Sequence, residues 1–443
     1  MAPQIQRLAG RYVRPAYDAL SIRQPDAQIR PGVEEQAMAQ IEAPFRIRSL
    51  GLSVYLPTVL FAIGQGAAIP VIPLFAKDLG ASVAFAATIV SLRGWGTMAF
   101  DLPAGALIAR FGERRSMLFG TLALAVTPFA ILVSHSALVF AALVFVMGCS
   151  FSIWQLARLA YVTERAPLDV RGRALSLLGG TNRFGNLIGP LVGGVVAETY
   201  GLETAFWIQA ALACAASAVM YALVRDDDRA GAEAAHGGIY GRFAGVIVEH
   251  RRVFLTAGLA TIAIQLLRRS REAAIPLWGD AIGMSPSQIG LILSGSIFIE
   301  VLLFYPTGIV MDRWGRKWTG VPCLIFMAIG LMLFPFAHSF TGLLLAGMVT
   351  GLGNGFGSGI AMTLGADFSP SVGRNEFLGV WRLVGDVGGA AGPMFIGGLA
   401  GAIGLGGAIV ASGGVGALGA VVLLFFVAEP LRRARDPVEP RPG

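Results

Sequence analysis

The decapeptide GIVMDRWGRK, from Gly308 to Lys317, decides the fold because a near copy of it, GALIARFGER, runs from Gly105 to Arg114. Numbers in the two copies differ by 203 (308 minus 105) throughout. Both are charged stretches in a chain that otherwise avoids charge for long runs. The main difference is Ala109, which stands where the later copy has Asp312. A charged hairpin that occurs twice indicates a chain built from two related halves.

The composition is that of an integral membrane protein. Hydrophobic residues make up 55% of the chain and charged residues 14%, and the mean hydropathy is +0.68. Apolar runs of about 20 residues, enough to cross about 30 Å of hydrocarbon, recur between residues 51 and 427. We expect helices, because a spanning segment must satisfy its own backbone hydrogen bonds. The first 45 residues or so are polar, so we expect no signal peptide.

The pattern predicts an all-α polytopic protein with twelve transmembrane helices. The expected spans are 51–76, 83–109, 116–134, 138–163, 172–197, 203–224, 253–279, 286–311, 318–337, 341–366, 375–400 and 404–428. Arginines gather in the loops on one side, whereas the opposite loops carry little beyond Lys77, Asp78, Glu203 and Asp280. By the positive-inside rule we expect both termini in the cytoplasm and the protein in the inner or plasma membrane of the cell.

The offset of 203 continues well beyond the hairpins. It relates Pro73 to Pro276, Gly80 to Gly283, Gly148 to Gly351 and Gly189-Pro190 to Gly392-Pro393. Six spans in each half give the halves the same orientation, with a binding site between them at mid-membrane. The expected divisions are an N-terminal tail (1–48), a six-helix bundle (49–224), a linker (225–252), a second bundle (253–428) and a C-terminal tail (429–443).

Two motifs carry a family resemblance over the twelve spans. The first, Gly308, Asp312, Arg313, Gly315, Arg316 and Lys317, resembles the loop signature of the major facilitator superfamily. The second, Gly185, Gly189, Pro190, Gly193 and Gly194, resembles the helix 5 signature of that superfamily's proton-driven drug exporters. The resemblance implies two pseudo-symmetric six-helix bundles and export. It departs at Ser176, where the signature has glycine, and in helix 4, where Phe145 precedes Gly148 and the family's arginine is missing.

Each motif has a functional and a structural interpretation. Asp312 could meet the N-terminal end of helix 5 near Arg171, where the helix dipole favours an anion, and so hold the cytoplasmic side shut. Alternatively both hairpins only anchor the topology. The helix 5 glycines around Pro190 could form a gating hinge, or they could simply allow close helix packing.

Charges inside the spans are the strongest functional signal, because each costs about 2.5–3.5 kcal/mol if unpaired at the bilayer centre. In the family's architecture helix 2 faces helix 11 and helix 5 faces helix 8. We therefore expect two ion pairs between the halves, Asp101–Arg382 and Arg183–Glu300. Asp386 is left without an obvious partner and is the first candidate for a proton site, with Glu300 second. The alternative is that Asp386 pairs with Arg93 or Arg268.

Arginines outnumber acids within the spans, which suits an anionic or zwitterionic substrate. The expected cavity residues are Arg93, Arg268, Arg269, Arg271, Gln65, Gln155, Gln265, Asn354 and Trp381. The three cysteines show no disulfide or metal spacing, and no nucleophile, cofactor or nucleic-acid motif is readable. The glycine-rich run from Gly351 to Gly359 lies inside an apolar span, where helix packing or flexibility is expected rather than a nucleotide loop.

The leading hypothesis is a secondary transporter, not an enzyme, that exports a small organic solute in exchange for protons. Its expected partners are the bilayer, the solute and protons, with no nucleic acid and a monomeric state. Proton-coupled uptake or exchange of an organic anion fits the charges equally well and is disfavoured only by the helix 5 motif. A sensor or lipid-handling relative that does not transport is a third possibility.

Overall fold

The computed structural model describes residues 51–133, 135–224, 245–371 and 373–429, and these ranges contain helices and loops but no strand. The helices of the first half are η2 (Gly51–Tyr55), α3 (Leu56–Ala68), α4 (Val71–Asp78), α5 (Val83–Phe111), α6 (Glu113–Val133), α7 (Ala137–Arg165), α8 (Leu168–Tyr200) and α9 (Glu203–Leu223).

The second half repeats this order. Its helices are α11 (Arg251–Val253), η3 (Phe254–Gly258), α12 (Leu259–Ala281), α13 (Pro286–Trp314), α14 (Lys317–Leu333), η4 (Phe334–Phe336), α15 (Phe340–Phe356), α16 (Ile360–Phe368) and α17 (Arg374–Phe425). α17 contains two predicted spans, which meet at a break at Gly404 (φ 74°, ψ 163°).

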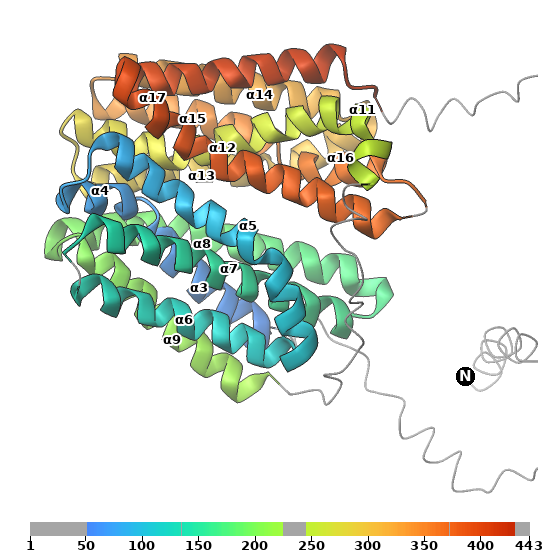
Figure 1. The fold of residues 1–443 in the computed structure, drawn as a ribbon, viewed down its shortest axis with the longest axis horizontal. Coiled ribbons are helices and arrows are strands. Elements are labelled where there is room, and N and C mark those ends of the chain that lie inside the picture. Colours follow the sequence, from blue (N-terminus) through green and yellow to red (C-terminus); the bar gives the residue numbers. More distant parts are fainter. Residues whose placement is uncertain (1–50, 134, 225–244, 372, 430–443) are drawn as a thin grey trace, which may run out of the picture. The chain divides into compact units, whose positions relative to one another are not determined.

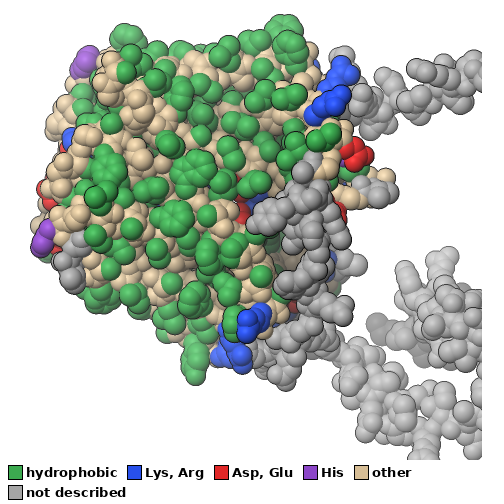
Figure 2. Space-filling model, in the orientation of Figure 1, with side chains coloured by type: hydrophobic (Ala, Val, Ile, Leu, Met, Phe, Trp, Pro, Cys, Tyr) green, Lys and Arg blue, Asp and Glu red, His purple; other side chains and the backbone are tan. Residues whose placement is uncertain are grey.

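When helical segments that follow directly on one another are counted as one span, and α17 as two, the described helices form twelve spans, as predicted (Figure 1). Eight helical stretches within the described ranges are long and apolar enough to cross a membrane. α17 counts once among them although it contains two predicted spans, and α6, α8 and α12 are not among the eight. On the face shown in Figure 2, hydrophobic side chains are spread over the whole surface, and most of the visible Lys and Arg lie at the right-hand end.

The repeat is visible in the backbone as well as in the sequence. Gly80, Gly112 and Gly201 have φ of 84°, 81° and 99°, and each ends a helix or begins a turn. Their counterparts 203 residues later, Gly283, Gly315 and Gly404, have φ of 78°, 114° and 74°. Positive φ strains any residue with a Cβ, so these glycines allow the same turns in both halves. The turns therefore impose the same helix order twice.

Glycines also set the packing distance inside each half, and again in equivalent pairs. A Cβ on Gly148 of α7 would overlap the carbonyl oxygen of Arg93 on α5. A Cβ on Gly351 of α15 would overlap the carbonyl oxygen of Ser296 on α13, which is the equivalent contact. Small residues let membrane helices approach closely where no hydrophobic effect drives them together. These two contacts hold α5 and α13, the helices that line the interface between the halves.

Two seams join the halves, which we define by their helix pairs. α5 packs against α17 at one seam, and α8 packs against α13 at the other (Figure 1). The division into a 49–224 bundle and a 253–428 bundle stays a prediction, and the tail at 1–48 and most of the linker lie outside the described residues.

We predict that Gly148→Ala destabilises the protein by about 1–3 kcal/mol, because the added methyl forces α5 and α7 apart. Gly105→Ala is the matched control, since a Cβ there meets nothing within 4 Å and alanine favours a helix by about 1 kcal/mol. Thermal unfolding in detergent should show a lower midpoint for the first variant only. Equal midpoints would contradict the packing role of Gly148.

Candidate functional site

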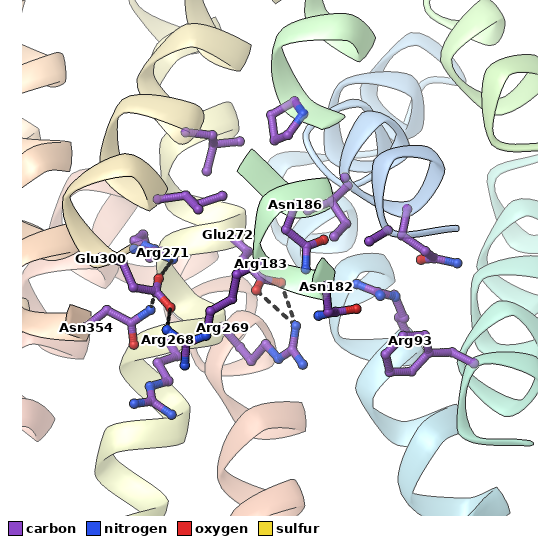
Figure 3. A pocket seen from close by; sticks show the side chains of 18 of the residues that line it. Arg93, Asn182, Arg183, Asn186, Arg268, Arg269, Arg271, Glu272, Glu300 and Asn354 are labelled. Carbon is purple, nitrogen blue, oxygen red and sulfur yellow. Dashed lines mark hydrogen bonds and ion pairs between the residues drawn. The ribbon is translucent and has the colours of Figure 1, made fainter. Parts of the chain in front are cut away.

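A cavity of about 390 Å³ lies between the halves. Both halves contribute side chains to it, as Figure 3 shows for ten of them. The lining residues are Phe61, Ala62, Gln65, Gly66, Ile69, Arg93, Phe151, Gln155, Asn182, Arg183, Asn186, Pro190, Gln265, Arg268, Arg269, Arg271, Glu272, Leu293, Ile297, Glu300 and Asn354. The cavity is thus mainly polar, in a region that the sequence places inside apolar spans.

Five arginines and two glutamates give this cavity a surplus of three positive charges. Glu300 on α13 lies 3.5 Å from Nη1 of Arg183 on α8 and 3.6 Å from Nη2 of Arg271 on α12. Asn354 also donates a hydrogen bond to Glu300 (Figure 3). Arg269 pairs with Glu272 at 2.9 Å. One carboxylate thus bridges two arginines from different halves, and the structure brings the expected pair Arg183 and Glu300 together.

The remaining two cavity arginines have no carboxylate within 4 Å among the described residues. Arg93 lies over the ring of Phe151, with its guanidinium carbon 5.1 Å from the ring centroid. Arg268 donates to Oε1 of Gln265 at 2.9 Å and to the backbone carbonyl of Gly357 at 2.6 Å. These two side chains therefore carry two of the three surplus charges, and the third belongs to Arg183 and Arg271, which share Glu300.

The acceptor for Arg268 exists because a helix breaks. α15 ends at Phe356 and α16 begins at Ile360, and between them Gly359 has φ 82°. The sequence predicts one continuous span at 341–366, so this break was missed, although the glycine-rich run was noted there. At the break the Gly357 carbonyl accepts from the N–H of Ile360 at 3.2 Å and from Arg268 at 2.6 Å, so it serves the arginine as well as the turn.

Sequence reasoning also missed some of the neutral lining. Asn182 and Asn186 come from α8, and their spacing of four puts them on one face with Pro190, which is a signal that the sequence does contain. Phe61 and Phe151 add aromatic surface, and the ring of Phe61 stacks on that of Trp154 at 3.7 Å.

Trp381 is the one expected cavity residue that the structure places elsewhere. Its side chain is 5% exposed, stacks on Phe377 at 6.1 Å between ring centroids, and donates to the carbonyl of Ala361 at 2.7 Å. An indole that packs and bonds in this way supports the second half rather than lining the cavity. The other eight predicted residues line it.

A second charged cluster, made by Asp101, Arg382 and Asp386, lies at the α5–α17 seam. Arg382 Nε is 3.3 Å from Oδ2 of Asp101 and 3.7 Å from Oδ2 of Asp386. Ser152 of α7 donates a hydrogen bond to Asp101. The expectation that Asp386 lacks a partner is therefore wrong, and so is the alternative of Arg93 or Arg268. Asp386 shares one guanidinium with Asp101 because it lies one helical turn beyond Arg382 on α17.

The hairpin motif is joined to its own half. Asp312 is largely exposed and pairs with Arg316 at 3.6 Å, whereas Arg171 donates to the carbonyl of Ala166, so the expected latch between these residues is absent from this structure. Arg316 also pairs with Asp367 of α16 at 2.7 Å.

Glu429 completes the hairpin network. Its carboxylate accepts from the backbone N–H groups of Arg316 and Lys317 at 2.8 and 3.0 Å, at the start of α14. Gly315 leaves room for this carboxylate, which a Cβ would meet at 2.7 Å. Gly308 has open space around it, and Arg313 is exposed. The motif therefore fastens the end of α17 to the α13–α14 turn.

The helix 5 glycines pack closely in this structure. α8 runs unbroken through Pro190, and added Cβ atoms on Gly185, Gly189 and Gly193 would overlap α3. Gly194 faces Pro286 of the other half. Their geometry gives them a packing role, and the gating hinge stays a prediction.

Opposite the hairpins, the halves touch at the turns around Gly80 and Gly283. Lys77 forms an ion pair with Asp280, which is its own counterpart in the repeat. A residue can contact its repeat counterpart only near the pseudo-symmetry axis. Glu198 also accepts from the backbone N–H of Ser287 at 3.1 Å across this end. These contacts hold the two halves together at the Lys77 end.

We predict that reversing either charge, as Lys77→Asp or Asp280→Lys, opens this end because like charges then meet on the axis. The double variant with both changes should behave as wild type, since the repeat makes the two positions interchangeable. Spin labels at Asp78 and Ala281, which are exposed and occupy equivalent positions in the repeat, would report the distance between the two halves at this end. A double variant as open as the single variants would show that the ion pair does not close this end.

Comparisons with known proteins agree with this architecture. The family model described as Major Facilitator Superfamily matches residues 54–271 and 253–442. The chain is 22% identical over 303 residues to the quinolone resistance protein NorA of Staphylococcus aureus (strain MSSA476), covering 68% of this chain and 77% of that protein. It is 24% identical over 351 residues to a multi-drug resistance efflux pump PmrA homolog of Lactococcus lactis subsp. lactis (strain IL1403), covering 75% and 84%.

Solved structures show the same fold. A variant of the nucleoside transporter NupG superposes with a TM-score of 0.71 at 14% identity, covering 86% of this chain and all of that one. A D-xylose–proton symporter gives a TM-score of 0.67 at 15% identity, covering 87% and 98%.

Proposed function

This chain belongs to the major facilitator superfamily, and we propose that it is a secondary active transporter that exports a small, negatively charged organic solute in exchange for protons. The observation that carries the proposal is the central cavity, where five arginines meet two glutamates. Alternating access between two pseudo-symmetric halves would expose this cavity to each side of the membrane in turn.

The charge surplus supports an anion over a cation. Charges inside a membrane protein are costly unless they are paired or face water, and Arg93 and Arg268 have no carboxylate partner among the described residues. An anionic group on the solute would supply that partner. Aromatic rings and side-chain amides in the same cavity suit a solute that is also partly apolar.

Export is supported by the helix 5 motif and by relatives that are named as a quinolone resistance protein and an efflux pump. Uptake of the same anion would use the same cavity. We place the protein in the inner or plasma membrane, with the hairpin end and both termini in the cytoplasm. The Lys77 end then faces outward, and its closed contacts correspond to an inward-facing state.

Protons would be carried by carboxylates at the seams. At the α5–α17 seam, Asp101 and Asp386 share one arginine, so the cluster holds one more negative than positive charge. A proton on either acid removes the excess, because two neighbouring carboxylates disfavour double ionisation. Glu300 is the second candidate, since it binds arginines of both halves and lines the solute cavity.

We predict that proteoliposomes with an imposed pH gradient lose that gradient faster when an organic anion is added, and that Asp386→Asn abolishes this effect. A panel of organic anions and lipophilic cations, with an internal pH-sensitive dye, measures it. Glu203→Gln is the control, because Glu203 is exposed at the start of α9, outside both clusters.

The outcomes separate the parts of the proposal. If only cations dissipate the pH gradient, the inference that the solute is an anion is wrong. An anion that dissipates the gradient equally in Asp386→Asn would move proton coupling to Glu300, which Glu300→Gln would then test. If no compound moves protons, proton-coupled export is wrong.

A further inference from the structure

We propose that the solute carries two acidic groups, one held by Arg93 and the other by Arg268, so that it bridges the two halves. This inference rests on the proposed function and names the substrate class of the same cavity. Arg93 comes from α5 of the first half and Arg268 from α12 of the second, and Figure 3 shows them well apart in the cavity.

Arg93 has its full hydrogen-bonding capacity free. An arginine has five N–H donors, and the Arg93 guanidinium forms no hydrogen bond or ion pair within the described ranges. Its Nε is buried without a partner, and the ring of Phe151 supports the guanidinium plane. The neighbouring carboxylate, Glu272, has both oxygens 2.9 Å from Nη1 of Arg269. Arg93 is thus held in place by packing while its donors stay available.

Arg268 is positioned differently but is available in the same way. Two of its donors are used, one by Gln265 and one by the carbonyl of Gly357. Its Nε is also buried and has no hydrogen-bond partner in the described part of the chain. Neither acceptor is charged, so the positive charge of Arg268 is not neutralised. The helix break at Gly357 therefore orients the side chain of Arg268 without neutralising its positive charge.

The other three cavity arginines each lie within 4 Å of a carboxylate, although Arg183 and Arg271 have only one negative charge between them. Arg183 and Arg271 share Glu300, and Arg269 pairs with Glu272. A solute with one acidic group would leave either Arg93 or Arg268 unpaired at mid-membrane, whereas two acidic groups would pair both. Two separated arginines thus favour two separated anionic groups.

The surface of the cavity also offers contacts for the body of such a solute. Gln65 is 3% exposed and lines the cavity, and neither its amide nitrogen nor its amide oxygen has a hydrogen-bond partner among the described residues. Phe61 and Phe151 stack at 6.3 Å between ring centroids and present apolar surface. A rigid aromatic or short apolar linker between the acidic groups fits this lining.

The test is equilibrium binding to purified wild-type protein in detergent, without any gradient. Rigid aromatic diacids of increasing span, beginning with terephthalate, are each paired with a mono-acid that has a methyl group in place of the second carboxylate, such as 4-methylbenzoate. We expect at least one diacid to bind about tenfold more tightly than its partner, as one further charge-assisted contact predicts. Arg93→Gln and Arg268→Gln should each remove that preference and leave mono-acid binding measurable.

Two controls keep the result interpretable. Arg110→Gln changes an exposed arginine on the same helix as Arg93, and Arg252→Gln changes an exposed arginine at the start of the second half. Both control variants should still bind the diacid more tightly than the mono-acid. Arg93→Lys should keep part of it, and the thermal midpoint of each unliganded variant reports folding.

If each mono-acid binds as tightly as its diacid, or if the preference survives in both glutamine variants, the proposal is overturned. Export of a solute with one acidic group would remain possible, because the gradient assay measures it separately.

Discussion

The structure depends on the cost of placing charge in hydrocarbon. An unpaired charge at mid-membrane costs about 2.5–3.5 kcal/mol, so a helix can carry one only where it faces a partner or water. In this protein, charged side chains within the spans of α5, α8, α13 and α17 meet at the interface between the halves. Arg183 reaches Glu300 at one seam, and Arg382 reaches Asp101 at the other. Both ion pairs join the halves in this conformation, and one of them, Arg183–Glu300, also lines the cavity.

The repeat gives the two halves a similar backbone, and the side chains that differ between the halves determine what the interface can bind. Equivalent glycines bend the chain and set helix contacts in both halves, as Gly148 and Gly351 do. Side chains at the seams differ at equivalent positions: Arg183 corresponds to Asp386, and Arg268 corresponds to Gln65. A symmetric backbone can rock about its axis, while unlike side chains let each seam and each wall of the cavity bind a different group.

Much of the candidate site could be predicted from the sequence, because a charged residue in an apolar span must face a charged partner or water. Arg183 and Glu300 could be paired by their depth in the spans once the family architecture put their helices side by side. Trp381 could not be placed in this way, because aromatic residues occur both in protein cores and in cavity walls. Asp386 was misjudged for another reason. Depth alone does not reveal that Arg382, one turn away on the same helix, can serve two carboxylates.

By itself, the sequence determined the helical membrane fold, the two-fold repeat and the chemical character of the interface, because hydrophobic run length, glycine spacing and intramembrane charge are local properties. Only the tertiary structure decided which charges are compensated. Among the described residues, Arg93 and Arg268 have no carboxylate within 4 Å, because Glu272 pairs with Arg269 and because Arg268 donates to the neutral carbonyl of Gly357 where α15 ends. Such facts depend on distances of a few ångströms between segments far apart in the chain, which no local pattern encodes.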